Sequence, residues 1–350
     1  MSARENIREP REGIREPREN IRELVLQRLR EDSSFVLAAH ENPDGDALGS
    51  LVAMQGLLTA LGKDSAMFIA PEDLPLPYEY QGLFDLAGLI QAPPADVAQR
   101  TVIFLDCGNI DRNSATVLRE GREVINIDHH HDNTRFGTID HVLPQASCTA
   151  EIVWELMVAM GVSPSPAVAR ALYVALITDT GRFMYENTGP RAHEMAGALI
   201  GAGVDVQRVY RKLYEEMPEA KVRLLALALA RMRRYDDGEL TIAALTAEDF
   251  RSLDAEDSYS EGIIDHLRAL RGTKVAVLVR ELTAPGRAGQ AKVSLRAVDD
   301  EVDVSAIARE QGGGGHRRAA GFSTALDVEE LTAFLRRAIA AQLHPEPAPA

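Results

Sequence analysis

Hydrophobic and polar positions in the first half of the chain predict short buried strands that alternate with helices. The run FVLAAH at 35–40 has the character of a buried strand, ENPDG follows as a turn, and apolar residues from Leu51 to Leu61 recur at helical spacing until Gly62. Three further apolar runs follow, at 65–70, 101–106 and 123–128. None of them alternates cleanly with polar residues, as expected for parallel strands that are covered on both faces. This pattern predicts a doubly wound α/β domain.

The second half of the chain begins with helical patterns and then returns to strands. Helical spacing dominates from about 149 to 233. Strand-like segments and one amphipathic helix follow, at 240–245, 274–280, 291–298 and near 327–342. A chain of 350 residues is long enough to form two cores. We therefore expect a first domain at 25–205, a helical linker at 206–235 and a smaller α/β domain at 236–343.

The two ends of the chain do not show the pattern of a packed core. Residues 4–24 read RENIREP, REGIREP and RENIREL, with one apolar position per unit and a proline closing the first two units. A coiled coil needs two apolar positions per heptad and no repeated proline. Residues 1–24 are therefore interpreted as a disordered or partly helical extension, and a partner-binding tail is the alternative. Residues 344–350 are expected to be a disordered tail.

Composition limits the classes of function that the chain can serve. Acidic residues outnumber basic ones 53 to 38, a net charge of −15, which disfavours a protein that coats nucleic acid through a broad basic surface. Cys107 and Cys148 are too few for a disulfide framework and fit no zinc-binding spacing. No apolar run reaches the roughly 18 residues of a membrane helix, and no apolar signal-peptide core is present at the start. We expect a cytoplasmic protein without membrane contact.

Carboxylate and imidazole side chains gather where the predicted strands end. They come from four separate segments and comprise His40, Asp44, Asp46, Asp106, Asp128, His129 and Asp179. In an open α/β sheet, the carboxyl ends of the strands meet at one edge, where ligands bind. Clustered carboxylates repel one another unless cations neutralise them, and a mixed imidazole and carboxylate shell suits Mn²⁺, Fe²⁺ or Zn²⁺ better than Ca²⁺. The pattern predicts a two-metal site.

Single members of this set also have purely structural interpretations. Asp44 could cap the following helix or serve an Asp-Gly turn, and Asp106 could form a turn at a strand end. The joint pattern favours the metal site. Neighbours in an extended chain point to opposite sides, so three consecutive histidines cannot all bind one metal pair. We assign His129 to metal, His130 to the scissile phosphate, and His131 to the surface or to a supporting contact.

These residues, in this order, resemble the DHH phosphoesterase superfamily, named for the motif that Asp128, His129 and His130 form here. The resemblance extends to HENPDGDALGS, to the isolated Asp106 and to the aspartate of ITDTGRF. The segment GGGGHRRAAG is similar to the glycine-rich signature of the DHHA1 domain, which implies a mixed sheet that closes over the active site and holds substrate. The two-domain length resembles the bacterial nano-RNase and pAp phosphatase group.

The resemblance also implies how the candidate residues share two divalent ions. One ion would be bound by His40, Asp44 and Asp106, and the other by Asp46, Asp106, His129 and Asp179. Asp106 would bridge the two ions. His130 and Asp128 form the expected catalytic pair, in which Asp128 supports the histidines and His130 contacts the phosphate or assists the departing alkoxide. Mn²⁺ is the preferred ion, with Mg²⁺, Fe²⁺ and Zn²⁺ left open.

A second group of residues is expected to hold the substrate. Successive glycines let backbone N–H groups approach an anion, and a neighbouring histidine and arginine add charge-assisted hydrogen bonds. A flexible turn before a strand is the alternative interpretation. The family resemblance adds the arginine of KVSLRAV, and another arginine follows Asp179. The expected substrate-binding residues are Gly313, Gly314, Gly315, His316, Arg317 or Arg318, Arg182 and Arg296.

The function implied by the resemblance is a metal-dependent phosphohydrolase. It would degrade RNA of about two to five nucleotides to 5′-mononucleotides and dephosphorylate 3′-phosphoadenosine 5′-phosphate, because little positive charge is present to hold a long strand. Cleavage of cyclic dinucleotides, or of linear pApA and pGpG, is the alternative. A non-catalytic nucleotide sensor is disfavoured because all expected metal ligands are present. A homodimer stays open as an oligomeric state.

Overall fold

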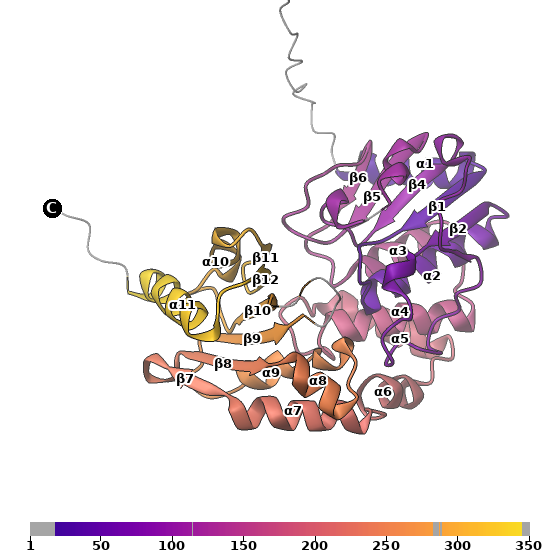
Figure 1. The fold of residues 1–350 in the computed structure, drawn as a ribbon. Helices are drawn as coiled ribbons and strands as arrows, with labels where there is room; N and C mark the ends of the chain where they lie inside the picture. The colour runs from indigo at the N-terminus through magenta and orange to yellow at the C-terminus, as the bar shows by residue number, and fades with distance from the viewer. Residues whose placement is uncertain (1–17, 114, 283–286, 288, 345–350) are drawn as a thin grey trace, which may run out of the picture. The chain divides into compact units, whose positions relative to one another are not determined.

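The computed structural model describes residues 18–113, 115–282, 287 and 289–344 (Figure 1). The chain divides into two compact units, Met1–Glu215 and Glu216–Ala350. Most of the predicted extension at 1–24 and most of the predicted tail lie outside the described residues. The predicted helical linker at 206–235 is shared between the units, because α6 (Val206–Tyr214) belongs to the first and α7 (Glu219–Arg231) to the second.

The first unit contains a six-stranded sheet in the order β3-β2-β1-β4-β5-β6, with every pairing parallel. Its strands are β1 (Ser34–Ala38), β2 (Asp64–Phe68), β3 (Leu89–Ile90), β4 (Thr101–Leu105), β5 (Glu123–Asp128) and β6 (Ile139–Val142). The strand order reverses its direction between β1 and β4. This arrangement confirms the predicted parallel α/β sheet, while the short strands β3 and β6 were not predicted.

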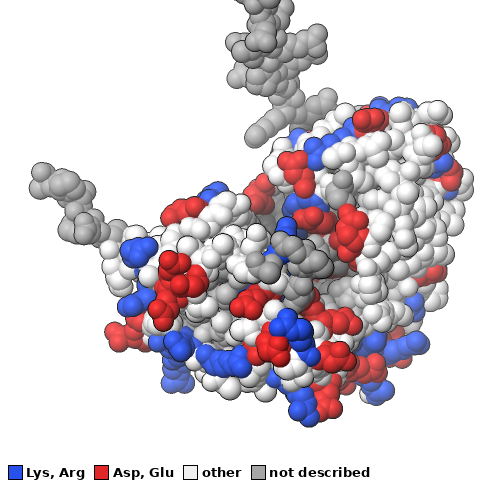
Figure 2. Space-filling model, in the orientation of Figure 1, with Lys and Arg blue, Asp and Glu red and all other residues white. Residues whose placement is uncertain are grey.

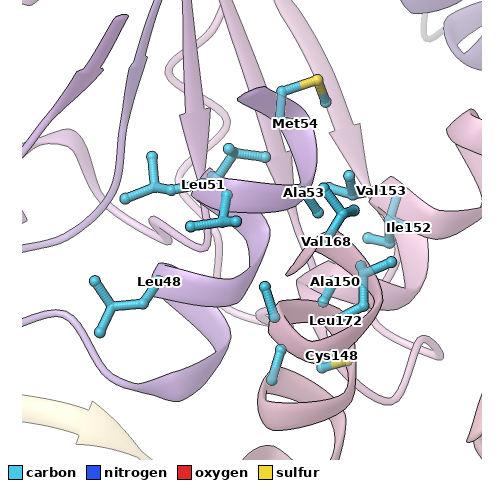
Figure 3. Close-up of a cluster of buried hydrophobic side chains, with 14 of the residues drawn as sticks. Leu48, Leu51, Ala53, Met54, Cys148, Ala150, Ile152, Val153, Val168 and Leu172 are labelled. Carbon is cyan, nitrogen blue, oxygen red and sulfur yellow. The ribbon is translucent and has the colours of Figure 1, made fainter. Parts of the chain in front are cut away.

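The two faces of this sheet carry separate cores, which explains why its strands show no polar alternation. Phe35 and Leu37 of β1 point into a large core formed with helices, whereas Val36 and Ala38 point into a smaller one. The smaller core is closed by short 3-10 turns, including η2 (Val97–Gln99) and η4 (Thr116–Glu120). The helices of this unit are α1 (Arg18–Glu31), α2 (Gly45–Ala60), α3 (Thr149–Ala159), α4 (Pro166–Asp179), α5 (Pro190–Gly201) and α6. Figure 3 shows residues of the larger core from α2, α3 and α4.

Helix α1 extends further toward the N-terminus than the expected domain start. Its residues Val25, Leu26 and Leu29 are buried in the large core. The heptad units have one apolar position each, but the segment LVLQRL that follows adds an apolar stripe at helical spacing. The last part of the predicted extension, residues 18–24, is therefore about the first two turns of a packed helix.

The second unit contains a mixed six-stranded sheet in the order β11-β12-β10-β9-β8-β7, in which only β8 and β9 pair in parallel. Its strands are β7 (Arg233–Tyr235), β8 (Leu240–Leu245), β9 (Val275–Glu281), β10 (Ala291–Ala297), β11 (Gly314–His316) and β12 (Ala319–Thr324). Its helices are α7, α8 (Ala247–Leu253), α9 (Ile263–Arg268), α10 (Val304–Glu310) and α11 (Val328–Leu343). The smaller α/β domain with a mixed sheet and the amphipathic C-terminal helix are confirmed.

Surface character agrees with the expectations from composition. Among the described residues, no helix has both the length and the apolar character needed to cross a membrane. On the face shown in Figure 2, acidic side chains lie between the basic ones over the described surface. The visible positive charge is therefore local, as the excess of acidic residues predicts.

Candidate two-metal centre

Five of the six predicted metal ligands come after the carboxyl ends of β1, β4 and β5, whereas Asp179, which was expected at a strand end, is the last residue of helix α4. His40 follows β1, Asp106 follows β4 directly, and His129 follows β5 directly. Strands β1 and β4 are the neighbours between which the strand order reverses. Loops diverge at such a point and leave a crevice, so ligands in open α/β sheets bind there. The topology therefore brings together residues that are far apart in the sequence.

Asp106 is the centre of this group. Its side chain is buried and accepts a 3.0 Å hydrogen bond from the Thr149 hydroxyl. The Nε2 atom of His40 lies 3.6 Å from its Oδ2, and the Nε2 atom of His129 lies 3.7 Å from its Oδ1. The Nδ1 atom of His130 is 3.6 Å from the same Oδ1. These separations are longer than hydrogen bonds.

His40, Asp44 and Asp106 form the first group of converging ligand atoms, all within 4.8 Å of one another. The Nδ1 atom of His40 is 2.7 Å from the Glu41 carbonyl oxygen, so it carries the proton and Nε2 keeps its lone pair. Asp44 caps helix α2 through Oδ1, which accepts from the amides of Asp46 and Ala47. Asp44 can therefore cap the helix and also bind a metal ion, because the cap uses only one of its two carboxylate oxygens.

Asp46, His129 and Asp179 form the second group within the same 4.8 Å limit. The His129 Nε2 atom lies 4.0 Å from Asp46 Oδ2 and 3.6 Å from Asp179 Oδ2. Asp46 is fixed by the first amides of α3, since Thr149 and Ala150 donate to it at 2.6 Å and 3.0 Å. The structure thus places all six predicted metal ligands in two groups, which the 3.7 Å separation between His129 Nε2 and Asp106 Oδ1 connects.

The chemistry of these groups fits divalent ions. Two ligand atoms bound at about 2.1 Å to one ion lie between roughly 3 Å and 4.2 Å apart. The four histidine–aspartate separations given above, from 3.6 Å to 4.0 Å, fall within this range. Burial and the charges of Asp106 and Asp179 raise the pKa of Asp46 well above its usual range. Burial, assisted by Asp106 and Asp44, raises the pKa of Asp179 to about 7. Cations between these carboxylates would relieve this repulsion, and mixed imidazole and carboxylate donors suit Mn²⁺, Fe²⁺ or Zn²⁺.

A third converging group contains Asp106, His129 and His130, and the His130 ring also pairs with Asp128. Asp128 is fully buried, and its Oδ1 lies 2.7 Å from the Nδ1 atom of His130. Burial opposes the charged ring, but this hydrogen bond and the charges of Asp106 and Asp128 raise the pKa of His130 to about 9. Asp128 belongs to none of the three converging groups among the described residues, and it orients His130. His131 is exposed and belongs to none of these groups among the described residues.

Four residues around the centre were not predicted from the sequence. Asn187 donates to Asp179 Oδ2 at 3.2 Å, and Thr149 donates to Asp106 as described above. Asn133 donates to the second oxygen of Asp128. The charge of Arg112, from η3 (Ile110–Arg112), partly opposes the raised pKa values of His40 and His130, so its guanidinium lies near both rings. None of these residues belongs to a motif, and only the folded chain brings them to the site.

Arg296 and Arg182 occupy different surroundings. Arg296 lies on β10 with Lys292 and Ser294 on the face opposite the core residues Val293 and Leu295. It lines a shallow pocket together with Lys292, Arg280 of β9 and Ser260. Arg182 is exposed, and its guanidinium lies 5.1 Å from the centre of the Tyr214 ring.

The glycine-rich segment forms an ordered hairpin, where a flexible turn was the alternative expectation. Strands β11 and β12 pair from Gly314 to His316, and a Cβ atom at Gly313 would lie 2.2 Å from the Gly321 carbonyl oxygen. Gly315 has a φ of +134°, which favours glycine. The side chain of His316 lies outside the description. Arg318 binds Asp300 through two 2.9 Å hydrogen bonds and Arg317 donates to its carbonyl oxygen, so Asp300 offsets part of this positive charge.

Comparison with known proteins agrees with this geometry in both units. Residues 34–176 match the N-terminal domain of the DHH family, and residues 239–342 match the DHHA1 domain. The chain is 31% identical over 312 residues to a protein of Thermus thermophilus named bifunctional oligoribonuclease and PAP phosphatase NrnA. This match covers 88% of the present chain and 89% of the relative.

Solved structures share the fold. An exopolyphosphatase-related protein from Bacteroides fragilis superimposes with a TM-score of 0.84 at 23% identity, covering 93% of this chain and 97% of that chain. RecJ from Thermus thermophilus, solved in complex with Mn²⁺, gives a TM-score of 0.53 at 17% identity. That match covers 92% of this chain and 54% of RecJ. Both likenesses concern the fold, across both units.

Proposed function

This chain belongs to the DHH family, carries a DHHA1 domain and is a hydrolase of the phosphoesterase type, and we propose that it degrades very short RNA and dephosphorylates pAp with two divalent ions. The observation that carries the proposal is the set of converging ligand groups that are linked through Asp106 and His129. Every position of the predicted ligand set is filled, which disfavours a non-catalytic nucleotide sensor.

Each of the two groups of ligand residues would bind one ion. His40, Asp44 and Asp106 would hold one ion, while Asp46, His129 and Asp179 would hold the other together with Asp106. When bound, such ions polarise a phosphoryl group and lower the pKa of water. Mn²⁺ is our preferred ion because the donor set is mixed and because the RecJ structure was solved with Mn²⁺.

Asp128 and His130 would handle the proton of the leaving group. The hydrogen bond between Asp128 Oδ1 and His130 Nδ1 fixes the ring, and the raised pKa keeps His130 protonated near neutral pH. A protonated imidazole beside the metal groups can donate a hydrogen bond to the phosphate and a proton to the departing alkoxide. Arg112 adds positive charge near the His130 ring.

The substrate would be a short nucleotide because positive charge for recognition is confined to small sites. In the second unit, Arg296, Lys292 and Arg280 line one pocket, and the edge strand β11 turns some main-chain groups of Gly314 and Gly315 away from its partner strand. These groups suit one or two phosphates, whereas a long strand needs an extended basic groove. The name of the Thermus thermophilus relative covers both short RNA and PAP as substrates.

A substrate panel with purified protein and Mn²⁺ tests this proposal. The panel contains pAp, RNA of two, five and 20 nucleotides, linear pApA and a cyclic dinucleotide. We expect rapid release of mononucleotides from the dinucleotide, phosphate release from pAp, and a steep fall in rate for the longest RNA. Equal rates on the shortest and longest RNA would contradict the proposal. Activity on cyclic dinucleotides alone would replace it with the alternative.

A further inference from the structure

The loop directly after Asp179 has an unusual backbone conformation. Gly181, Arg182 and Phe183 have φ values of +53°, +64° and +64°, so three consecutive residues lie in the left-handed region. Only glycine adopts this region without a steric penalty, and two of the three residues carry side chains. Strain of this kind persists when surrounding contacts enforce it, and it is concentrated at functional sites.

Contacts to both ends of the loop enforce this conformation. The Thr180 carbonyl oxygen accepts from the amides of Met184 and Tyr185, each at 3.0 Å. The ring of Phe183 stacks on His193 of α5 with 5.0 Å between centroids, so Phe183 is turned toward this helix. Asn187 closes the loop, because its side-chain amide donates to the carbonyl oxygen of Asp179 at 3.1 Å and to its carboxylate at 3.2 Å. The loop is therefore attached twice to one metal ligand.

The result is an apolar surface beside a polar centre. Met184 is 79% exposed and Tyr185 is 44% exposed. The Tyr185 ring lies directly over Gly181, where a Cβ atom would come within 2.4 Å of it, so the ring has a fixed support. The amides of both residues donate to the carbonyl oxygen of Thr180, the neighbour of Asp179, so the loop holds the backbone of both residues close to this predicted ligand.

We propose that Met184 and Tyr185 form a stacking surface for the base of the nucleotide whose phosphate is hydrolysed. This inference rests on the proposed function. Every base has an apolar face, and stacking on aromatic or thioether side chains binds bases without regard to sequence. The strained loop would hold this surface at a constant distance from the metal ligands, so that a bound base places its phosphate between the two groups.

The test compares Met184→Ala and Tyr185→Ala with Tyr185→Phe, which keeps the ring. Ile200→Ala serves as the control, because Ile200 is 48% exposed on α5 and distant in sequence from the loop. We expect KM for a dinucleotide to rise about 5- to 100-fold in the two alanine variants. KM should change less than twofold in Tyr185→Phe and in the control. KM for an analogue that lacks the base should be high in the wild type and unaffected by any of the substitutions.

A binding measurement separates this inference from the proposed function. An uncleavable dinucleotide with a fluorescent adenine analogue at the cleaved nucleotide should be quenched on binding to the wild type, and less so by Tyr185→Ala. Equal quenching in both proteins, or equal KM for substrates with and without a base, would overturn the stacking surface while leaving hydrolysis intact. Quenching that depends on Tyr185 without any hydrolysis would support the surface and contradict the proposed function.

Discussion

A methyl group added at Gly49 should disturb both the fold of the first unit and its metal centre. Helices α2 and α4 approach closely at this glycine, where a Cβ atom would lie 2.5 Å from the Ala171 carbonyl oxygen and 2.7 Å from the Ala175 methyl group. Backbone atoms cannot move aside as the end of a flexible side chain can. Helix α2 carries Asp46, and α4 ends at Asp179, so separating these helices also separates two ligands.

The magnitude follows from two opposing effects. Overpacking a close contact costs about 1–3 kcal/mol, while alanine in place of glycine within a helix gains up to about 1 kcal/mol. We expect Gly49→Ala to lower the free energy of unfolding by about 1–2 kcal/mol, which corresponds to a Tm roughly 2–8 °C lower for a unit of this size. Gly197→Ala is the matched control, because Gly197 lies in α5 with no atom within 4 Å of its added Cβ. It should be slightly stabilising.

Urea unfolding monitored by tryptophan fluorescence measures this effect in the first unit, because Trp154 of α3 is the single tryptophan of the chain. Calorimetric titration with Mn²⁺ then measures the metal centre. Weaker binding in Gly49→Ala and unchanged binding in Gly197→Ala are expected. Equal stability and equal Mn²⁺ affinity of the two variants would refute the idea that the α2–α4 contact positions the ligands.

Three further changes probe single contacts. His130→Gln should lower kcat at least about 100-fold without loss of bound Mn²⁺, whereas His131→Gln should change it less than twofold; equal small effects would show that the two histidines are wrongly distinguished. Asn187→Ala should weaken Mn²⁺ binding about 10- to 100-fold through Asp179, with the Tm nearly unchanged, and an unaltered binding isotherm would dismiss this role. Burial, reinforced by the charge of Arg22, lowers the pKa of His141 from 6.5 to about 4. His141 therefore binds a proton in the unfolded chain at a pH where it stays neutral in the folded chain. The free energy of unfolding should fall by about 3 kcal/mol as the pH drops from 6.5 to 4. His141→Gln should flatten this part of the stability profile, and an identical slope in both proteins would count against it.

The convergence of most candidate metal ligands could be predicted because their positions follow from strand ends, although Asp179 lies at the end of helix α4. The apolar runs before His40, Asp106 and His129 identify parallel strands, and the carboxyl ends of such strands share one edge. The two-residue strand β3 and the four-residue β6 leave too few positions for a pattern to emerge. The strands β3 and β6, which form the two edges of the sheet, were therefore not predicted.

Residues that support the ligands could not be predicted from the sequence. Asn187 and Thr149 act through single side-chain hydrogen bonds to Asp179 and Asp106, and no periodicity marks such contacts. The glycine-rich segment reads as a turn, yet close contact between β11 and β12 explains the small residue at Gly313. In each case the requirement comes from tertiary packing.

Hydrolysis of a dinucleotide during titration of metal-free protein with Mn²⁺ tests most directly whether the histidine and carboxylate centre works with two ions. The rate should stay low through the first equivalent and reach its maximum only when two ions per chain are bound. Asp106→Asn, which alters the residue proposed to bridge the two ions, should bind fewer ions and lose essentially all activity while keeping its secondary structure. Full activity with one bound ion, or substantial activity in Asp106→Asn at saturating Mn²⁺, would contradict a shared two-metal centre.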